Sequence, residues 1–205
     1  MAQTAMIEKT VYDFSELSDS AKDNAISKYC CNYDWWDSSY DDFVQVLEIL
    51  GFDVRNYDNP KNGPNIEFSG FSHQGSYAAF SGSYCYRKNM MKAIKEYAPK
   101  DEVLHEIASA LFEMQRTCFY ALSAKFTYSD YRGYSIDMED SRRQYGFMDS
   151  IETEGEFRRI LKKLSNWIYD SLEKEYEYRM SYESFQEDCD ANDYTFDQNG
   201  NLDYI

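Results

Sequence analysis

Apolar residues recur every three or four positions in several stretches of the chain, which is the spacing that places them on one face of a helix. The longest such stripe predicts a buried helix from about Asp101 to Ser123. Ser18 followed by Asp19 is typical of a helix N-terminus, and Gly51 is a natural C-terminal stop. Further helices are expected over residues 18–33, 37–50, 88–98 and 157–176, with a short one capped by Ser181.

Elsewhere the apolar residues alternate with polar ones, as they do in half-buried strands. This pattern predicts strands over residues 10–14, 52–57, 66–71, 77–86, 125–129, 133–138, 194–196 and 202–205. The clusters Asn59–Pro64, Asp130–Gly133 and Asp197–Gly200 supply turns between them. Helices and strands come in blocks, which predicts an α+β fold with an antiparallel sheet and hairpins packed against several helices. We expect a single domain over residues 1–205, with a sub-boundary near residues 86–100.

The charge of the chain adds more to this description than its hydropathy does. The 205 residues include 37 acidic and 21 basic side chains, for a net charge of −16. Residues 1–60 and 151–205 each carry a net −8, whereas residues 61–100 carry +4. No apolar run approaches the roughly 20 residues of a membrane span, and no basic, apolar and small-residue succession at the start marks a secretory signal. We therefore expect a cytoplasmic protein.

The acidic ends carry the candidate binding residues. Duplex DNA presents about one charge per 1.7 Å of its axis, and carboxylates along helices and hairpin edges can approximate that density. Such a surface would bind a Lys- and Arg-lined groove, with a tryptophan as an anchor; a merely solubilising surface is the alternative. The candidates are Asp34, Trp35, Trp36, Asp37, Asp41, Asp42, Glu183, Glu187, Asp188, Asp190 and Asp193.

The same negative field argues against direct binding of nucleic acid over a broad face. A small basic block is the exception to it; its residues are Arg87, Lys88, Lys92, Lys95 and Lys100.

The cysteines and histidines predict neither a metal site nor a cofactor. The five cysteines form no CxxC motif, and the adjacent Cys30 and Cys31 would point in different directions on a helix. We expect these thiols to be small buried groups in a reducing cytoplasm. His73 and His105 lack a second histidine nearby; a pairing of His73 with Cys85 is the alternative to a tyrosine-rich strand pair.

Catalytic motifs are equally scarce in the sequence. None of the common nucleophile-elbow, phosphate-loop, dinucleotide-binding or zinc-protease patterns occurs. The segment Asp188–Asp193 begins like a calcium-binding loop, but Asp193 and Asn199 stand where that loop needs Gly and Glu. We therefore expect a protein that is not an enzyme.

Three segments resemble small acidic proteins encoded by phages and prophages. Residues Tyr12–Ala25 resemble their F-x-x-L-S-x-x-A-K-x-x-A opening, and Phe68–Phe80 is similar to their SGF-x-x-QG-x-x-A-x-F strand pair. The ending Ala191–Phe196, with its turn at Gly200, also resembles theirs. That family has no settled activity, and some members carry antitoxin-like labels. The resemblance implies a mobile-element origin and a bacterial host cell, and it assigns no functional residue.

Origin and charge together predict an inhibitor of a bacterial nucleic-acid-binding defence system, acting as a DNA or RNA mimic through protein–protein binding. CRISPR effectors and restriction enzymes are the expected partners. The first alternative is an antitoxin-like module that binds one protein partner through an apolar groove. The second alternative is an enzyme that degrades a nucleotide signal, which would need clustered buried carboxylates and a metal.

Overall fold

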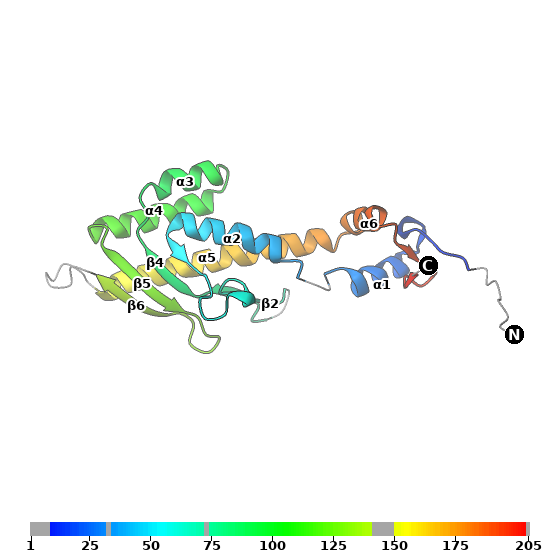
Figure 1. Cartoon of the computed structure of the whole chain (residues 1–205), viewed down its shortest axis with the longest axis horizontal. Coiled ribbons are helices and arrows are strands. Elements are labelled where there is room, and N and C mark those ends of the chain that lie inside the picture. The colour runs from blue at the N-terminus through cyan, green and yellow to red at the C-terminus, as the bar shows by residue number, and fades with distance from the viewer. Residues whose placement is uncertain (1–8, 32–33, 72–73, 141–149, 204–205) are drawn as a thin grey trace. The chain divides into compact units, whose positions relative to one another are not determined.

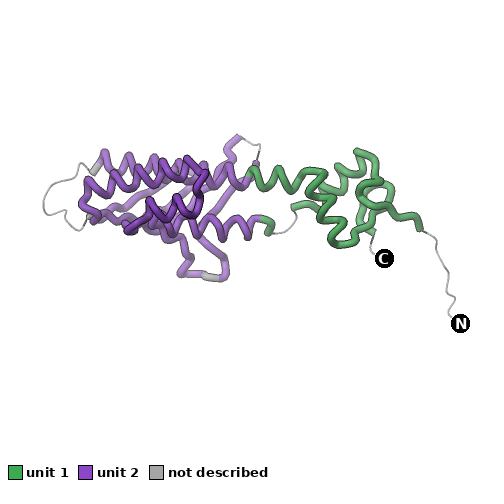
Figure 2. Tube along the Cα trace, turned by 90° about the horizontal axis from the view of Figure 1, so that it is seen from above, with its two compact units in different colours: residues 1–35, 173–205 green, residues 36–172 purple. Residues whose placement is uncertain are grey.

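The computed structural model describes residues 9–31, 34–71, 74–140 and 150–203 (Figure 1). Contacts along the chain divide it into two compact units, coloured separately in Figure 2. Unit 1 comprises Met1–Trp35 and Glu173–Ile205, and unit 2 comprises Trp36–Leu172. The expected sub-boundary at residues 86–100 lies inside unit 2, because that segment includes a helix that packs within this unit.

Unit 2 combines helices with antiparallel strands, which confirms the predicted α+β class. A four-stranded sheet has the order β1-β4-β5-β6, and β2 and β3 form a separate hairpin. Its helices are α2 (Asp37–Leu50), α3 (Met90–Tyr97), α4 (Glu102–Thr117) and the first part of α5 (Ser150–Arg179), with a 3-10 turn at Pro60–Asn62. Its strands are β1 (Phe52–Asp53), β2 (Ile66–Ser69), β3 (Tyr77–Phe80), β4 (Gly82–Cys85), β5 (Leu122–Thr127) and β6 (Ser135–Asp140).

An aromatic cluster holds the sheet against α5. The Phe52 ring packs on Tyr84 at 4.9 Å and edge-on against Phe126 at 5.8 Å, and Phe157 of α5 stacks on it at 6.1 Å. All four side chains are buried, and aromatic pairs of this geometry contribute about 0.5–1.5 kcal/mol each beyond their burial. Because strand side chains alternate between faces, the opposite face of this sheet carries the polar residues.

Helix α4 is shorter than the predicted helix over Asp101–Ser123. It ends at Thr117, because Phe119 and Tyr120 take positive φ angles of 52° and 60°. The buried amide of Gln115 then donates to the Leu122 carbonyl at 2.8 Å and accepts from the Leu122 amide at 3.3 Å. A side chain of α4 thus satisfies the backbone hydrogen-bonding groups of the first residue of β5. The stripe of apolar residues in the sequence did not indicate this contact.

Two predicted strands were also wrong in their extent. The stretch 77–86 is not one strand but two, β3 and β4, which belong to different sheets. They part at Ser81, whose backbone amide donates to Asn65 and whose hydroxyl accepts from the Tyr128 amide. Strand β1 covers only Phe52 and Asp53 because the Asp53 carboxylate then accepts from the Arg55 amide and turns the chain.

Unit 1 forms from the two segments that flank unit 2. It contains residues 173–179 of α5 and a 3-10 turn at Phe14–Glu16. Its other elements are α1 (Asp19–Tyr29), α6 (Tyr182–Ala191), β7 (Thr195–Phe196) and β8 (Leu202–Asp203). The predicted caps Ser18 and Ser181 are confirmed, since each hydroxyl accepts a backbone N–H in the first turn of its helix.

The core of unit 1 is small and aromatic. Phe14, Phe185 and Phe196 lie at its centre, with ring centroids 5.0–6.4 Å apart, and Ala21 and Ala25 of α1 allow close approach. The strand expected at residues 10–14 was wrong, because only Tyr12 pairs, through one bridge to Phe196. None of the helices in the described segments is long and apolar enough to cross a membrane.

Candidate functional site

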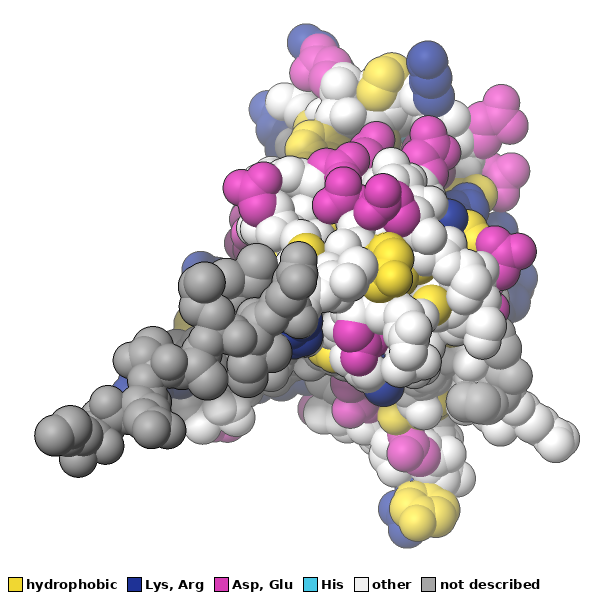
Figure 3. All heavy atoms as spheres, turned by 90° about the vertical axis from the view of Figure 1, so that its right-hand side faces the viewer, with side chains coloured by type: hydrophobic (Ala, Val, Ile, Leu, Met, Phe, Trp, Pro, Cys, Tyr) yellow, Lys and Arg dark blue, Asp and Glu magenta, His cyan; other side chains and the backbone are white. Residues whose placement is uncertain are grey.

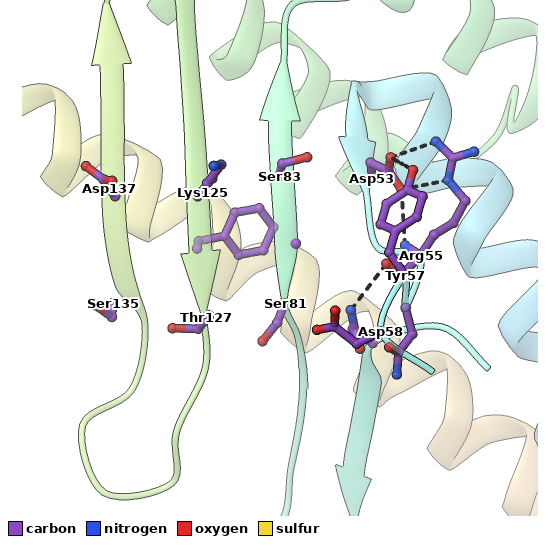
Figure 4. A pocket seen from close by; sticks show the side chains of 14 residues that line it. Asp53, Arg55, Tyr57, Asp58, Ser81, Ser83, Lys125, Thr127, Ser135 and Asp137 are labelled. Atoms are coloured by element: carbon purple, nitrogen blue, oxygen red, sulfur yellow. Dashed lines mark hydrogen bonds and ion pairs between the residues drawn. The ribbon is translucent and has the colours of Figure 1, made fainter. Parts of the chain in front are cut away.

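Unit 2 carries a polar hollow of about 460 Å³ on the face of its sheet that is opposite the aromatic cluster (Figure 4). Strand register builds its floor: Asp53 pairs with Ser83, Ser83 with Lys125, and Lys125 with Asp137. These four side chains form one row across the sheet. The next row contains Ser81, Thr127 and Ser135, so that the floor offers hydroxyl groups around a single ammonium group.

One wall of the hollow is a fixed trio of side chains. The Asp53 carboxylate accepts from Arg55 Nε at 2.9 Å, from Arg55 Nη2 at 2.7 Å and from the Tyr57 hydroxyl at 2.7 Å. The Arg55 guanidinium also lies over the Tyr57 ring, 5.2 Å from its centroid. The hydrogen bonds from Arg55, ahead of that from Tyr57, hold the pKa of Asp53 well below its usual range.

The hollow offers hydroxyls, carboxylates, a guanidinium and an ammonium group, which can form hydrogen bonds and ion pairs. Its lining contains serine and threonine hydroxyls but no histidine or cysteine, so none of these hydroxyls has a neighbouring imidazole base. The hollow is also open to solvent, whereas most small-molecule sites are enclosed.

Replacing Asp53 with asparagine is expected to lower the free energy of unfolding of unit 2 by about 1 kcal/mol at pH 7, the upper end for an exposed ion pair. Because the folded-state pKa of Asp53 is lowered, its contribution is complete above the unfolded value near 4 and is lost as pH falls through the folded value. Urea unfolding at pH 7 and at pH 2.5 measures this difference. Asp58→Asn, an exposed acid on the same loop, is the control; a gap that is as large at pH 2.5 as at pH 7 contradicts the assignment.

The predicted acids of the C-terminal segment lie in unit 1. Glu183, Glu187 and Asp190 are exposed at positions i, i+4 and i+7 of α6, and therefore share one face of that helix. Asp188 is exposed on a different side of α6, and Asp193 follows the helix with φ 54°. Unit 1 faces the viewer in Figure 3, where acidic side chains crowd together on its surface.

The basic residues of unit 1 do not neutralise this face. Residues 1–35 and 173–205 contain 16 acidic and five basic side chains, a net −11 out of the total −16. Lys9 pairs with Asp203, Arg179 pairs with Glu175, and Lys28 donates to Asn201. Within the described segments no salt bridge reaches an acid of α6.

Exposed tyrosines accompany these acids. Tyr178, Tyr182 and Tyr194 are 55%, 43% and 43% exposed and lie in or beside α5 and α6. The Tyr182 hydroxyl donates to Asp23 at 2.5 Å, which fixes the ring at the surface. Tyrosine supplies rigid contact area at low entropic cost, as in antibody binding sites.

The predicted acids near the tryptophans divide between the units. Asp34 and Trp35 belong to unit 1, where the Trp35 ring lies 5.8 Å from Tyr176. Trp36 belongs to unit 2 and packs edge-on against Phe68 at 5.4 Å. Both tryptophans are half-buried, so each also serves the packing of its own unit.

The three α2 acids differ in their surroundings. Asp37 and Asp41 are exposed on the outer side of α2, whereas Asp42 accepts a hydrogen bond from the Tyr97 hydroxyl of α3. The structure therefore brings together the acids of α6 but does not join them with those of α2 in one unit. Asp42 has a structural contact that sequence spacing did not indicate.

The remaining candidate groups are structural or lie outside the described residues. His105 is half-buried, and its Nε2 lies 2.8 Å from the Ala98 carbonyl oxygen. The pairing of Cys85 with His73, which was the alternative to a tyrosine-rich strand pair, involves a residue outside the described segments. Residues 188–191 are helical rather than a calcium loop, and the described residues contain no group of three or more candidate metal ligands.

The five cysteines are free thiols, but they are not all buried as expected. Cys118 and Cys189 are buried, whereas Cys85 is exposed because it lies on the open face of β4. The basic block that begins at Arg87 is exposed on and around α3, where Lys92 pairs with Glu96.

Fold and surface together define an α+β protein with a polar sheet face in one unit and an acidic helix in the other. The chain belongs to the family described as domain of unknown function DUF8835, which matches residues 35–182. The matched region includes all of unit 2 and ends just before Glu183, so the acids of α6 follow it. No curated protein and no solved structure matches the chain. The resemblance to phage-encoded proteins stays a prediction.

Proposed function

We propose that the protein is an acidic inhibitor that binds a nucleic-acid-binding enzyme of a bacterial defence system in place of its nucleic acid. A CRISPR effector or a restriction enzyme is the proposed partner. The observation that carries the proposal is the row of carboxylates on α6, formed by Glu183, Glu187 and Asp190. This role requires a charged surface and no catalytic residue.

The spacing of the row supports mimicry. Successive carboxylates of the row are separated by rises of about 6 Å and 4.5 Å along the helix axis. One strand of a duplex carries a phosphate every 3.4 Å or so of axis, so the row has about two thirds of that charge density. Neighbouring acids at Asp188 and Asp193 add charge beside the row.

Electrostatics and contact chemistry act together in this proposal. A net −11 on unit 1 attracts a basic groove over about 8 Å, the screening length at physiological salt. Exposed Tyr182 and Tyr194 then supply the short-range contact area. Attraction of this kind accelerates capture and weakens steeply as salt is added.

The first test is a pull-down from bacterial lysate with the full chain at low salt, eluted with a salt gradient and identified by mass spectrometry. The proposal predicts a nucleic-acid enzyme that leaves the column at moderate salt and that added duplex DNA displaces. A complex that resists high salt and ignores DNA contradicts it and favours the antitoxin-like alternative. A metal-dependent thermal shift of the chain alone would instead favour the nucleotide-degrading alternative.

The second test removes the row of carboxylates. The triple variant Glu183→Gln, Glu187→Gln, Asp190→Asn is expected to weaken binding of the captured enzyme about tenfold or more, since each exposed ion pair contributes up to about 1 kcal/mol. Calorimetry or interferometry measures the change.

The matched control changes net charge equally, at three exposed acids of unit 2: Glu102→Gln, Glu139→Gln and Asp170→Asn. Equal weakening by both triple variants would show that only overall charge matters, and it would contradict the assignment to α6.

A further inference from the structure

The end of α1 brings two thiols into contact. The helix stops at Tyr29, Cys30 is extended with φ −77° and ψ 143°, and Cys31 turns to a positive φ of 55°. This change of backbone conformation places Cys30 Sγ 3.3 Å from Cys31 Sγ. The expectation that these side chains point in different directions was wrong, because it assumed that the helix continued through both residues.

The pair is anchored on one side and accessible on the other. Cys30 Sγ donates to the Arg179 carbonyl of α5 at 3.2 Å, and Arg179 is itself held by Glu175 at 2.6 Å. Both cysteines are only half-buried, so a small reagent can reach them.

Closing the pair as a disulfide is unfavourable. Adjacent residues in a trans peptide have Cα atoms about 3.8 Å apart, below the roughly 4.4–6.8 Å of ordinary disulfides. Burial raises the pKa of Cys30 to about 12 and also raises that of Cys31, so both groups are protonated thiols at neutral pH.

The sulfur separation suits a single thiophilic atom instead. Bonds of about 2.3 Å to two sulfurs 3.3 Å apart enclose an angle of about 90°, well below the roughly 109° of tetrahedral zinc. Zinc also needs further ligands, and the described residues contain no group of three or more that could hold a metal. A monosubstituted trivalent arsenical bonds to two sulfurs at nearly this angle and requires no third protein ligand.

We propose that Cys30 and Cys31 form a dithiol site for monosubstituted trivalent arsenicals, a binding activity separate from the acidic surface. In the reaction, two S–H bonds and the arsenic–oxygen double bond of an arsenoxide are replaced by two arsenic–sulfur bonds. The two thiol protons leave with the oxygen as one water molecule. No oxidant or reductant takes part.

Intact-protein mass spectrometry with phenylarsine oxide tests the site in the full-length chain. One phenylarsenic group per chain is expected, retained in excess glutathione and released by dithiothreitol, because only a dithiol competes with a chelate. Cys31→Ser is expected to reduce affinity at least about a hundredfold, the usual scale of a lost second attachment. Cys85→Ser, which removes an exposed thiol far along the sequence, should bind as the parent does.

Peptide mapping of the unmodified chain keeps the test independent of how the variants fold. Arsenic on the peptide that contains Cys30 and Cys31 supports the site. Loss of the adduct to glutathione, an unchanged affinity in folded Cys31→Ser, or arsenic mapped to other cysteines would overturn it.

Discussion

Replacing Gly82 with alanine is expected to lower the free energy of unfolding of unit 2 by about 3 kcal/mol or more. A Cβ atom at this position would lie 3.0 Å from the Asp53 carbonyl carbon, 3.3 Å from the Val54 Cα, and closer still to the Asp53 oxygen. These are backbone atoms of the neighbouring strand, so no side-chain rotation relieves the contact. Strands β1 and β4 would have to separate, and the wall of the hollow at Asp53 would move with them. Urea unfolding and amide exchange across β1 and β4 measure the effect.

Gly155→Ala is the matched control for this prediction. Gly155 lies within α5, and an added Cβ would meet no atom within 4 Å. Because alanine favours a helix over glycine by up to about 1 kcal/mol, this variant should be more stable than the parent. If Gly82→Ala and Gly155→Ala change the free energy of unfolding by similar amounts, the close approach of β1 to β4 is contradicted.

Replacing Gly200 with alanine is expected to destabilise unit 1 by about 3 kcal/mol or more, through two separate costs. Gly200 has a φ of 79°, a left-handed conformation that alanine adopts only with strain. An added Cβ would also lie 2.9 Å from the Ala21 carbonyl carbon of α1, and closer to its oxygen. The hairpin of β7 and β8 would be pushed away from α1, and amide exchange should rise in α1 and α6.

Gly133→Ala separates the two costs. Gly133 has a similar φ of 67°, but an added Cβ there meets nothing within 4 Å. Its substitution should therefore cost only the conformational part, about 1 kcal/mol. If Gly200→Ala proves no worse than Gly133→Ala, the close packing of the hairpin on α1 is contradicted.

Local signals in the sequence predicted much of this fold. Ser18, Ser181 and Gly51 mark helix ends because capping depends on a few neighbouring residues. The alternating stretch around Gly133 likewise predicted the hairpin of β5 and β6. These features need no knowledge of the rest of the chain.

Features that depend on distant partners could not be predicted in the same way. Strands β3 and β4 follow one another in sequence, yet β3 pairs with β2 and β4 pairs with β1 and β5. Gln115 lies in an apolar stripe, but its amide is needed by Leu122 beyond the helix end. The only indication of this contact in the sequence was a polar residue within an otherwise apolar stripe.

The candidate binding surface was likewise predictable where it depends on local sequence and not where it depends on distant partners. Acidity is countable in the sequence, and the period of α6 places Glu183, Glu187 and Asp190 together. The neighbours Trp35 and Trp36 nevertheless belong to different units, so proximity in sequence did not indicate a shared surface. The row that includes Lys125 and Asp137 depends on strand register, which no single segment specifies.

Because unit 1 needs both flanking segments, its acidic surface has a defined place in protein synthesis. The ribosome makes residues 1–35 before the 137 residues of unit 2, and it makes Glu173 onward after them. At about 5–20 residues per second, the first segment waits roughly 7–27 seconds for its partner. During that interval the nascent chain lacks α6 and exposes the apolar side of α1. A chain that is released prematurely, while the ribosome is still within unit 2, would therefore lack the acidic face.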